Sequence, residues 1–418
     1  MKFRRTGTVP PNSDVHFKTD HLRAGIGART IRGGAVTLSA QLLKLVLTTA
    51  SMVILARLLR PNDYGLIGMA SVTVGLVGIF KDIGLSAAIV QKPEITHEEV
   101  STLFWVNIGV SVCLTLITCA LAPGIALFYH EPRLLPVIMA LAGAFIFTGL
   151  NVQHQALLSR QMRFTSLAKI DIAALGIGVL VAIVMAKSGA GYWAIVCQQL
   201  AAALTSTTGA WWTCHWRPGR PSKMSSVRSM LAFGGNLTGY QFANYFARNA
   251  DTILIGRYCG TEQLGLYTRA YSLLMLPLNQ INGPITAVAI PALSRLVDNP
   301  EHYRRAYLRT LEKIMMLTMP IAALMLMASD WIIALLLGPK WVESSIIFAW
   351  LSIGAFTQPI GNTTGWLYQT QNRTRSMLHW GIIAGVLTVV SIVVGLPYGP
   401  VWVAASYSVS GLIIRTPL

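Results

Sequence analysis

Long apolar runs, separated by short polar connections, follow one another along almost the whole chain. A helix needs about 20 mostly apolar residues to cross a hydrocarbon core of roughly 30 Å. Runs that meet this requirement predict about twelve membrane-spanning helices, near residues 33–56, 64–80, 102–128, 134–158, 170–187, 190–214, 230–256, 264–294, 313–337, 345–368, 377–396 and 399–414. The pattern therefore predicts an all-α polytopic membrane protein.

Landmark residues of the first half recur in the second half at a nearly constant spacing. A shift of 200 residues places Gly34, Gln41, Ala50, Arg57, Gly65, Leu66 and Ala70 on Gly234, Gln241, Ala250, Arg257, Gly265, Leu266 and Ala270. Shifts of 208–210 align Gln161, Met162, Arg163, Gly191 and Trp193 with Gln371, Asn372, Arg373, Gly399 and Trp402. Because six spans is an even number, the halves have the same orientation, and a cavity is expected between two parallel lobes. The predicted division is a basic N-terminal segment (1–32), an N-lobe (33–217), a linker (218–229) and a C-lobe (230–418).

The charged residues are few and unevenly placed. Hydrophobic residues make up 53% of the chain and charged residues 12%, yet the net charge is +17. If the N-terminus is cytoplasmic, 24 of the 33 Lys and Arg residues fall in inner loops and six in outer loops. This bias follows the positive-inside rule and predicts a cytoplasmic N-terminus. The charge is then topological, with some attraction to anionic membrane lipids, and nucleic acid is not an expected partner.

Motifs for soluble or metal-dependent chemistry are missing from the sequence. The five cysteines are scattered through apolar stretches, and no GxxxxGK[ST], GxSxG or HExxH pattern occurs. The predicted outer loops are too short to hold a folded catalytic domain. We therefore expect a protein that is not an enzyme and has no cofactor, with a coupling proton or sodium ion as the remaining candidate.

Polar residues inside predicted spans are the candidate functional groups. In the first span Gln41, Lys44 and Thr48 share one helical face, and the seventh span carries Gln241, Asn244, Arg248 and Asp251 at equivalent positions, joined by Tyr240. Arg269 lies early in the eighth span. Ionised groups within a bilayer are costly and normally face an interior cavity. Three structural roles stay open as well: a hydrogen-bonded Lys44, an Arg248–Asp251 ion pair on one helix, and an Arg269 that extends to the interface.

Several stretches resemble a known family. They are Ala56–Leu66 (ARLLRPNDYGL), Phe80–Gln91 (FKDIGLSAAIVQ), Gln161–Arg163, Gly191–Trp193 and Gly265–Tyr267. These resemble the polysaccharide transporter family of Wzx-like O-antigen and exopolysaccharide flippases, especially the colanic-acid exporter branch, within the multidrug/oligosaccharidyl-lipid/polysaccharide exporter superfamily. The resemblance implies two six-helix lobes around a V-shaped cleft. It also implies a bacterial inner-membrane protein that translocates undecaprenyl-pyrophosphate-linked oligosaccharides by alternating access, with polysaccharide polymerase and co-polymerase as candidate partners. Members commonly carry about two further spans, which are absent or truncated here.

The charges within the spans fit such a substrate. A diphosphate carries about two negative charges, which Lys44, Arg248 and Arg269 could bind. Gln41, Thr48, Tyr240, Gln241 and Asn244 could hydrogen-bond sugar hydroxyls, and Asp251 completes the polar set. A cation-coupled multidrug exporter is the nearest competing function, but its cavity would favour acidic groups, whereas these candidates are net positive. A membrane glycosyltransferase or polymerase is a second competing function, and lipid scrambling without energy coupling is a third.

Overall fold

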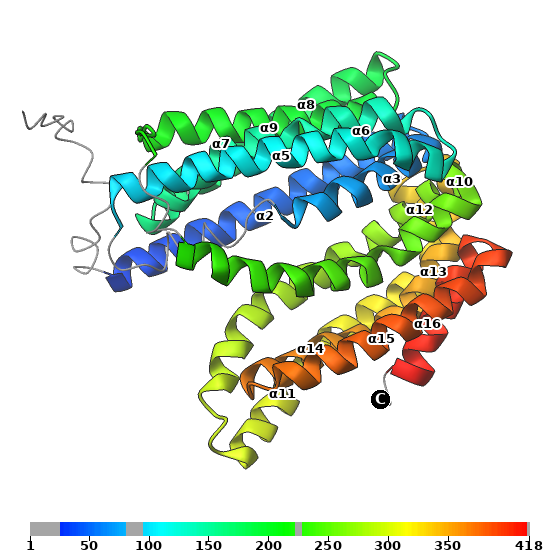
Figure 1. Cartoon of the computed structure of the whole chain (residues 1–418). Coiled ribbons are helices and arrows are strands. Elements are labelled where there is room, and N and C mark those ends of the chain that lie inside the picture. The colour runs from blue at the N-terminus through cyan, green and yellow to red at the C-terminus, as the bar shows by residue number, and fades with distance from the viewer. Residues whose placement is uncertain (1–25, 81–94, 222–227, 416–418) are drawn as a thin grey trace, which may run out of the picture. The chain divides into compact units, whose positions relative to one another are not determined.

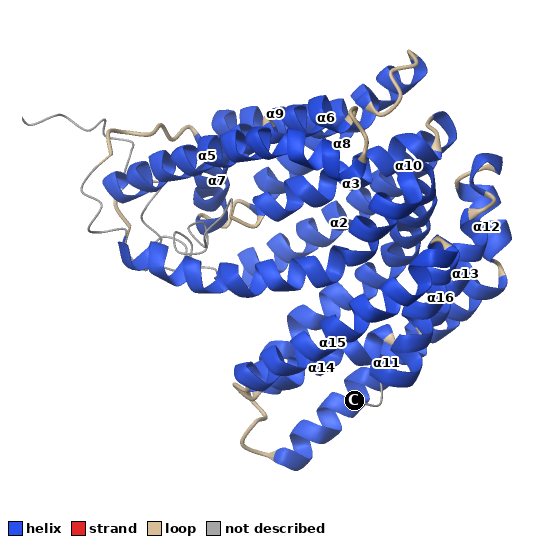
Figure 2. Cartoon of the chain, turned by 45° about the vertical axis from the view of Figure 1, so that its right-hand side comes forward, coloured by secondary structure: helices blue, strands red, loops and turns tan. Residues whose placement is uncertain are grey.

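The fold is built from helices. The computed structural model describes residues 26–80, 95–221 and 228–415, and within these ranges it contains helices and no strands (Figures 1 and 2). Seven of the described helical stretches are long and apolar enough to cross a membrane, and two shorter apolar helices, Ser344–Ala355 and Pro400–Ile413, accompany them. The chain is an all-α polytopic membrane protein, as the apolar pattern predicted.

The chain divides into two compact units. The first contains the described residues of 1–55, 73–127 and 132–242, and the second contains those of 56–72, 128–131 and 243–418. The turn that follows the first helix therefore belongs to the second unit.

The first unit is formed mainly by the helices of the N-terminal half. These are α2 (Ile26–Leu58), α5 (His97–Tyr129), α6 (Leu134–Ala142), α7 (Ala144–Arg160), α8 (Phe164–Lys187) and α9 (Trp193–Cys214), together with the last residues of α3 (Pro61–Gly78). Helix α9 packs along both α7 and α8. A core cluster that includes Phe104, Leu157, Ala210 and Trp216 is buried where α5, α7 and α9 meet. Burial of these side chains holds the three helices together.

The second unit contains residues 61–72 of α3 together with the remaining helices. These are α10 (Arg228–Ser294), α11 (Pro300–Met327), α12 (Ser329–Leu336), η3 (Pro339–Trp341), α13 (Ser344–Ala355), α14 (Gln358–Thr370), α15 (Thr374–Gly395), η4 (Leu396–Tyr398), α16 (Pro400–Ser410) and η5 (Gly411–Arg415). Residues 228–242 of α10 are the exception and belong to the first unit. Gly260 divides α10 into two helices, because its φ of 83° is a left-handed value that glycine adopts without steric cost. This break separates the predicted seventh and eighth spans.

Large apolar side chains cover much of the outer surface. Leu180 and Val184 on α8 are 64% and 66% exposed, and Val394 on α15 is 63% exposed. Within Arg375–Tyr398, which contains most of α15, only 11% of the most apolar 18-residue stretch is buried inside the protein. A soluble protein rarely exposes such continuous apolar surface, whereas hydrocarbon tails cover it without cost. These faces are the lipid-facing surface.

Two turns display the 210-residue repeat in their backbone geometry. Met162 between α7 and α8 has φ 54°, and Asn372 between α14 and α15 has φ 57°. In each turn the N–H of the next residue, Arg163 or Arg373, donates to a carbonyl oxygen five residues earlier, at 3.0 and 2.9 Å. This is the Schellman arrangement that ends a helix. The aligned Gln-x-Arg elements therefore form the same turn in both halves.

Two glycines in the second unit allow a close helix crossing. A Cβ on Gly65 of α3 would lie 1.6 Å from the carbonyl oxygen of Thr261, and one on Gly265 would lie 1.8 Å from that of Pro61. Pro61 and Thr261, like the two glycines, are 200 residues apart. A shift of 200 residues therefore converts each contact into the other, as expected when two repeats are related by a pseudo-twofold axis.

Candidate functional site

A polar pocket in the second unit holds three of the predicted site residues. The pocket has a volume of about 270 Å³ and lies between α3 and the two parts of α10. Its lining is Tyr64, Ile67, Gly68, Ser71, Val72, Arg248, Asn249, Asp251, Thr252, Tyr267, Thr268, Arg269, Tyr271 and Ser272. The lining residues recur every three or four positions, because each helix presents one face to the pocket.

Arg269 lies against the ring of Tyr64. The guanidinium carbon is 4.0 Å from the ring centroid, which is a cation–π contact. The Nε of Arg269 is buried and has no hydrogen-bond partner in the described part of the chain. The guanidinium is therefore held inside the pocket by an aromatic face, and one of its N–H donors is not used by the residues that the structure describes.

Asp251 and Arg248 do not neutralise each other. Asp251 is 9% exposed, and its carboxylate accepts hydrogen bonds from the Tyr267 hydroxyl at 2.8 Å and from the Thr252 N–H at 2.7 Å. Arg248 is exposed on the pocket lining, and no ion pair joins it to Asp251 or to another described residue. The carboxylate is therefore satisfied by neutral donors, and the Arg248 charge remains available.

In the first unit, Lys44 forms an ion pair with Asp171 of α8. The two side chains are 34% and 41% exposed. Seven residues after Lys44, the hydroxyl of Ser51 accepts a hydrogen bond from Gln198 Nε2 of α9 at 3.3 Å. The predicted polar face of α2 is therefore used in part to contact α8 and α9.

The remaining predicted site residues divide into two groups. Gln41 and Thr48 are exposed on α2. Tyr240, Gln241 and Asn244 lie outside the residues whose side chains the structure describes, so their contacts with sugar hydroxyls stay a prediction.

The sequence reasoning did not select Asp171, Tyr64 or Tyr267. Asp171 carries a detectable signal, because it is an acidic residue inside an otherwise apolar predicted span. The two tyrosines carry none, because tyrosine is common in spans and at their ends.

The chain matches the family model described as polysaccharide biosynthesis protein over residues 54–346. The chain belongs to this family. It is 25% identical over 373 residues to the lipopolysaccharide biosynthesis protein WzxC of Escherichia coli (strain K12), which covers 88% of this chain and 75% of WzxC. It is 27% identical over 347 residues to the teichuronic acid biosynthesis protein TuaB of Bacillus subtilis (strain 168), which covers 80% of this chain and 71% of TuaB.

Two solved transporters share the fold of this family member. The lipid II flippase MurJ in an inward closed conformation aligns with a TM-score of 0.73 and 14% identity, covering 92% of this chain and 85% of MurJ. An inward-facing multidrug resistance transporter of the MATE family aligns with a TM-score of 0.71 and 16% identity, covering 91% of this chain and 95% of that protein. At these identities the likeness shows the fold alone.

The pocket is suited to a compact anion. Its lining carries two guanidinium groups and one carboxylate, so its net charge is positive. Guanidinium groups bind phosphate through paired hydrogen bonds, and the hydroxyl and amide groups around them can complete the coordination. A volume near the lower end of ligand sites, which span about 300–1,000 Å³, fits a headgroup fragment better than a whole oligosaccharide.

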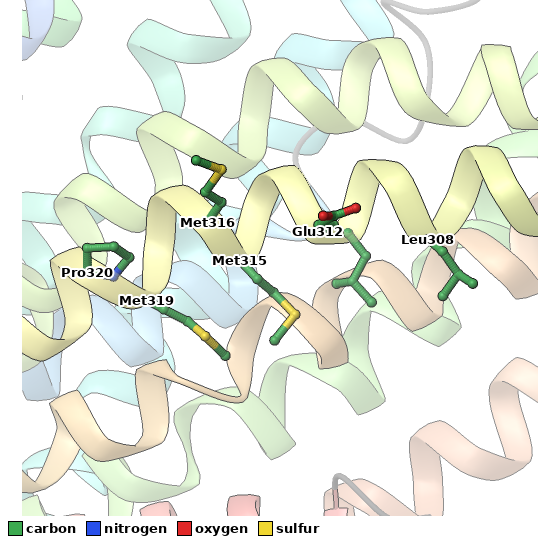
Figure 3. A pocket seen from close by; sticks show the side chains of 7 residues that line it. Leu308, Glu312, Met315, Met316, Met319 and Pro320 are labelled. Atoms are coloured by element: carbon green, nitrogen blue, oxygen red, sulfur yellow. The ribbon is translucent and has the colours of Figure 1, made fainter.

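A second hollow is lined by methionines of α11. It has a volume of about 580 Å³ and is lined by Leu308, Leu311, Glu312, Met315, Met316, Met319 and Pro320. Figure 3 shows Met315 and Met319 pointing to the same side of the helix. Methionine side chains are apolar and flexible, and no cationic residue lines this hollow. It fits hydrocarbon rather than a charged headgroup.

The potential metal ligands of the described residues are dispersed. No group of three or more His, Cys, Asp or Glu residues lies together there in a way that could hold a metal ion. The polar pocket offers one carboxylate, from Asp251, beside two guanidinium groups and several hydroxyl and amide groups.

Proposed function

We propose that this chain is a flippase that translocates undecaprenyl-pyrophosphate-linked oligosaccharides across the bacterial inner membrane by alternating access. It would be a transporter and not an enzyme, with its N-terminus in the cytoplasm. The proposal is supported by family membership and by named relatives in lipopolysaccharide and teichuronic acid biosynthesis. The delivered unit would serve exopolysaccharide, capsule or O-antigen synthesis, in which polymerase and co-polymerase proteins are the expected partners.

The observation that carries the proposal is the positive pocket of the second unit. Arg248 is not paired with Asp251, and the Nε of Arg269 has no partner among the described residues, so both cations can bind an incoming pyrophosphate. The prenyl tail would stay among the lipids, because a pocket of about 270 Å³ is too small to hold it. Alternating access would then open the site, with the headgroup bound to these cations, first to the cytoplasmic side and then to the outer side.

An export assay tests this role of Arg248. The chain and its variants would be produced in a bacterial host that lacks its own flippase but still makes the lipid-linked unit. We expect Arg248→Ala to lower polysaccharide export about ten- to hundredfold at equal protein level, because a hydrogen bond to a charged group contributes about 1.5–3 kcal/mol. Arg248→Lys should retain part of the activity, since it keeps the charge but loses the paired geometry.

Arg305→Ala is the matched control. Arg305 is exposed on α11 and pairs only weakly with Glu301, at 3.5 Å, so its loss should leave export unchanged. Normal export by Arg248→Ala would contradict the role of the pocket.

A cation-coupled multidrug exporter is the second candidate function, because the pocket also contains the Asp251 carboxylate. A net positive pocket disfavours cationic drugs. Resistance to cationic drugs conferred by the chain, without restored export, would support the exporter function. Formation of a glycosidic bond by the purified protein in detergent would instead support an enzyme.

A further inference from the structure

The Lys44–Asp171 ion pair is placed where a purely structural pair would be costly. Asp171 lies seven residues into α8, about 10 Å from its start at 1.5 Å per residue, and Lys44 is near the middle of α2. Each charged side chain is more than a third exposed. Charges exposed to hydrocarbon cost several kcal/mol, so the open side of this pair must face water or a polar ligand.

The attachment of α2 to its neighbours does not depend on this pair alone. Ser51, two turns further along α2, is 5% exposed and accepts a hydrogen bond from Gln198 of α9. Ala40 and Met52 of α2 are also buried. An accessible ion pair adds little to helix packing that is already in place. The position of this ion pair is therefore better explained by a polar ligand that reaches its exposed side than by helix packing.

We propose that Asp171 is an exchangeable counter-ion that controls which anions can take Lys44. This inference rests on the proposed function. Without substrate, the carboxylate of Asp171 occupies the ammonium group of Lys44. An incoming anion must displace that carboxylate, and it succeeds only if it binds Lys44 more strongly than Asp171 does.

The charge of the headgroup sets the outcome of this competition. An ordinary membrane phospholipid has a phosphodiester with one negative charge, the same charge as the Asp171 carboxylate. The pyrophosphate of a prenyl-linked glycan carries about two, which gives it the stronger attraction to Lys44. Asp171 would thus prevent bulk phospholipid, which is far more abundant than substrate, from occupying Lys44. When the substrate leaves, Asp171 pairs again with Lys44 and completes the release.

Lipid binding to the purified full-length chain in detergent tests the inference, with undecaprenyl pyrophosphate and phosphatidylglycerol as probes and native mass spectrometry as the readout. Wild type should prefer the pyrophosphate. Asp171→Asn should bind phosphatidylglycerol about tenfold more tightly, and its preference for pyrophosphate should fall by a similar factor. Asp171→Glu, which keeps the charge, should keep the preference.

A second variant separates counter-ion exchange from simple stabilisation. Lys44→Ala and the double variant Lys44→Ala/Asp171→Asn should bind both lipids alike, because Asp171 acts only through Lys44. Three results would overturn the inference. Asp171→Asn could keep the wild-type preference, or it could bind both lipids more weakly by the same factor. Its effect on binding could also persist in a protein without Lys44. A wild-type protein that binds no pyrophosphate lipid would instead contradict the proposed function.

The charge-reversed variant Lys44→Asp/Asp171→Lys covers the case in which Asp171→Asn does not fold. It keeps an ion pair between α2 and α8, so it should fold with a thermal unfolding temperature near that of wild type. It keeps a cation with an exchangeable carboxylate beside it, so the preference for pyrophosphate should be kept. Loss of the preference in a folded charge-reversed variant would overturn the inference.

Discussion

At the scale of single residues, Tyr64 contributes through its ring and not through its hydroxyl. The ring lies under the Arg269 guanidinium and meets the ring of Trp341 edge-on, with centroids 5.4 Å apart. The hydroxyl oxygen is buried without a hydrogen-bond partner in the described part of the chain. A buried polar atom without a partner destabilises the folded state, whereas a ring over a desolvated cation stabilises it.

We therefore expect opposite results from two substitutions of Tyr64. Tyr64→Phe keeps the ring and removes the unpaired hydroxyl, so it should be neutral or raise the thermal unfolding temperature. Tyr64→Leu removes the cation–π contact and should destabilise the protein by about 2 kcal/mol. Thermal unfolding in detergent measures both. A Phe variant as unstable as the Leu variant would show that the hydroxyl has a partner, for example a bound water.

Part of the candidate site could be predicted from the sequence, residue by residue. Arg248, Asp251 and Arg269 could be selected because a charge inside an apolar span is conspicuous, and all three line one pocket. The partner of Lys44 could not be identified, since Asp171 is 127 positions away and no local periodicity connects them. The Arg248–Asp251 spacing allowed a pair, but Tyr267, from the other part of α10, takes the carboxylate instead.

At the scale of elements, the crossing of α3 and α10 makes two glycines sensitive to the smallest substitution. The neighbours of Gly65 and Gly265 are backbone carbonyls, which cannot rotate away as a side chain could. Gly65→Ala or Gly265→Ala must separate the two helices, and each should lower the thermal unfolding temperature by several degrees or prevent folding.

Gly283 is the matched control for this prediction. It lies on α10, as Gly265 does, and a Cβ there would meet nothing within 4 Å. Gly283→Ala should be neutral or stabilising, because alanine favours helix more than glycine does. Equal effects of Gly265→Ala and Gly283→Ala, measured by thermal unfolding and by the yield of folded protein, would contradict the close crossing.

The apolar runs were enough to place most helices within a few residues of their ends, but not to show where a run contains two helices. The predicted span 313–337 is divided at Ala328 into α11 and α12, and the span 345–368 is divided into α13 and α14. Pro359 is the second residue of α14 and could have indicated the break. Ala328 gives no such signal, because alanine is the residue that most favours helix, although its backbone angles here, φ −106° and ψ 21°, are not helical.

At the scale of the whole molecule, the internal repeat predicts that the two halves have the same orientation in the membrane. The turns at Arg163 and Arg373 have the same backbone geometry and are 210 residues apart. Ser188, after α8, and Tyr398, after α15, are also 210 residues apart, and both are exposed. If the halves are parallel and the N-terminus is cytoplasmic, the two arginines lie on the inner side, and Ser188 and Tyr398 lie on the outer side.

Single cysteines at these four positions test both the parallel orientation of the halves and the cytoplasmic position of the N-terminus. The background would lack the five native cysteines, of which Cys113 is exposed and Cys214 is buried. In intact spheroplasts, a membrane-impermeant maleimide should label Ser188→Cys and Tyr398→Cys, and should label Arg163→Cys and Arg373→Cys only after the membrane is permeabilised. The opposite pattern at all four sites would reverse the orientation, and disagreement between two sites 210 residues apart would contradict the parallel repeat. A cytoplasmic N-terminus would place 24 of the 33 basic residues in inner loops, and the reversed orientation would remove that explanation of their distribution.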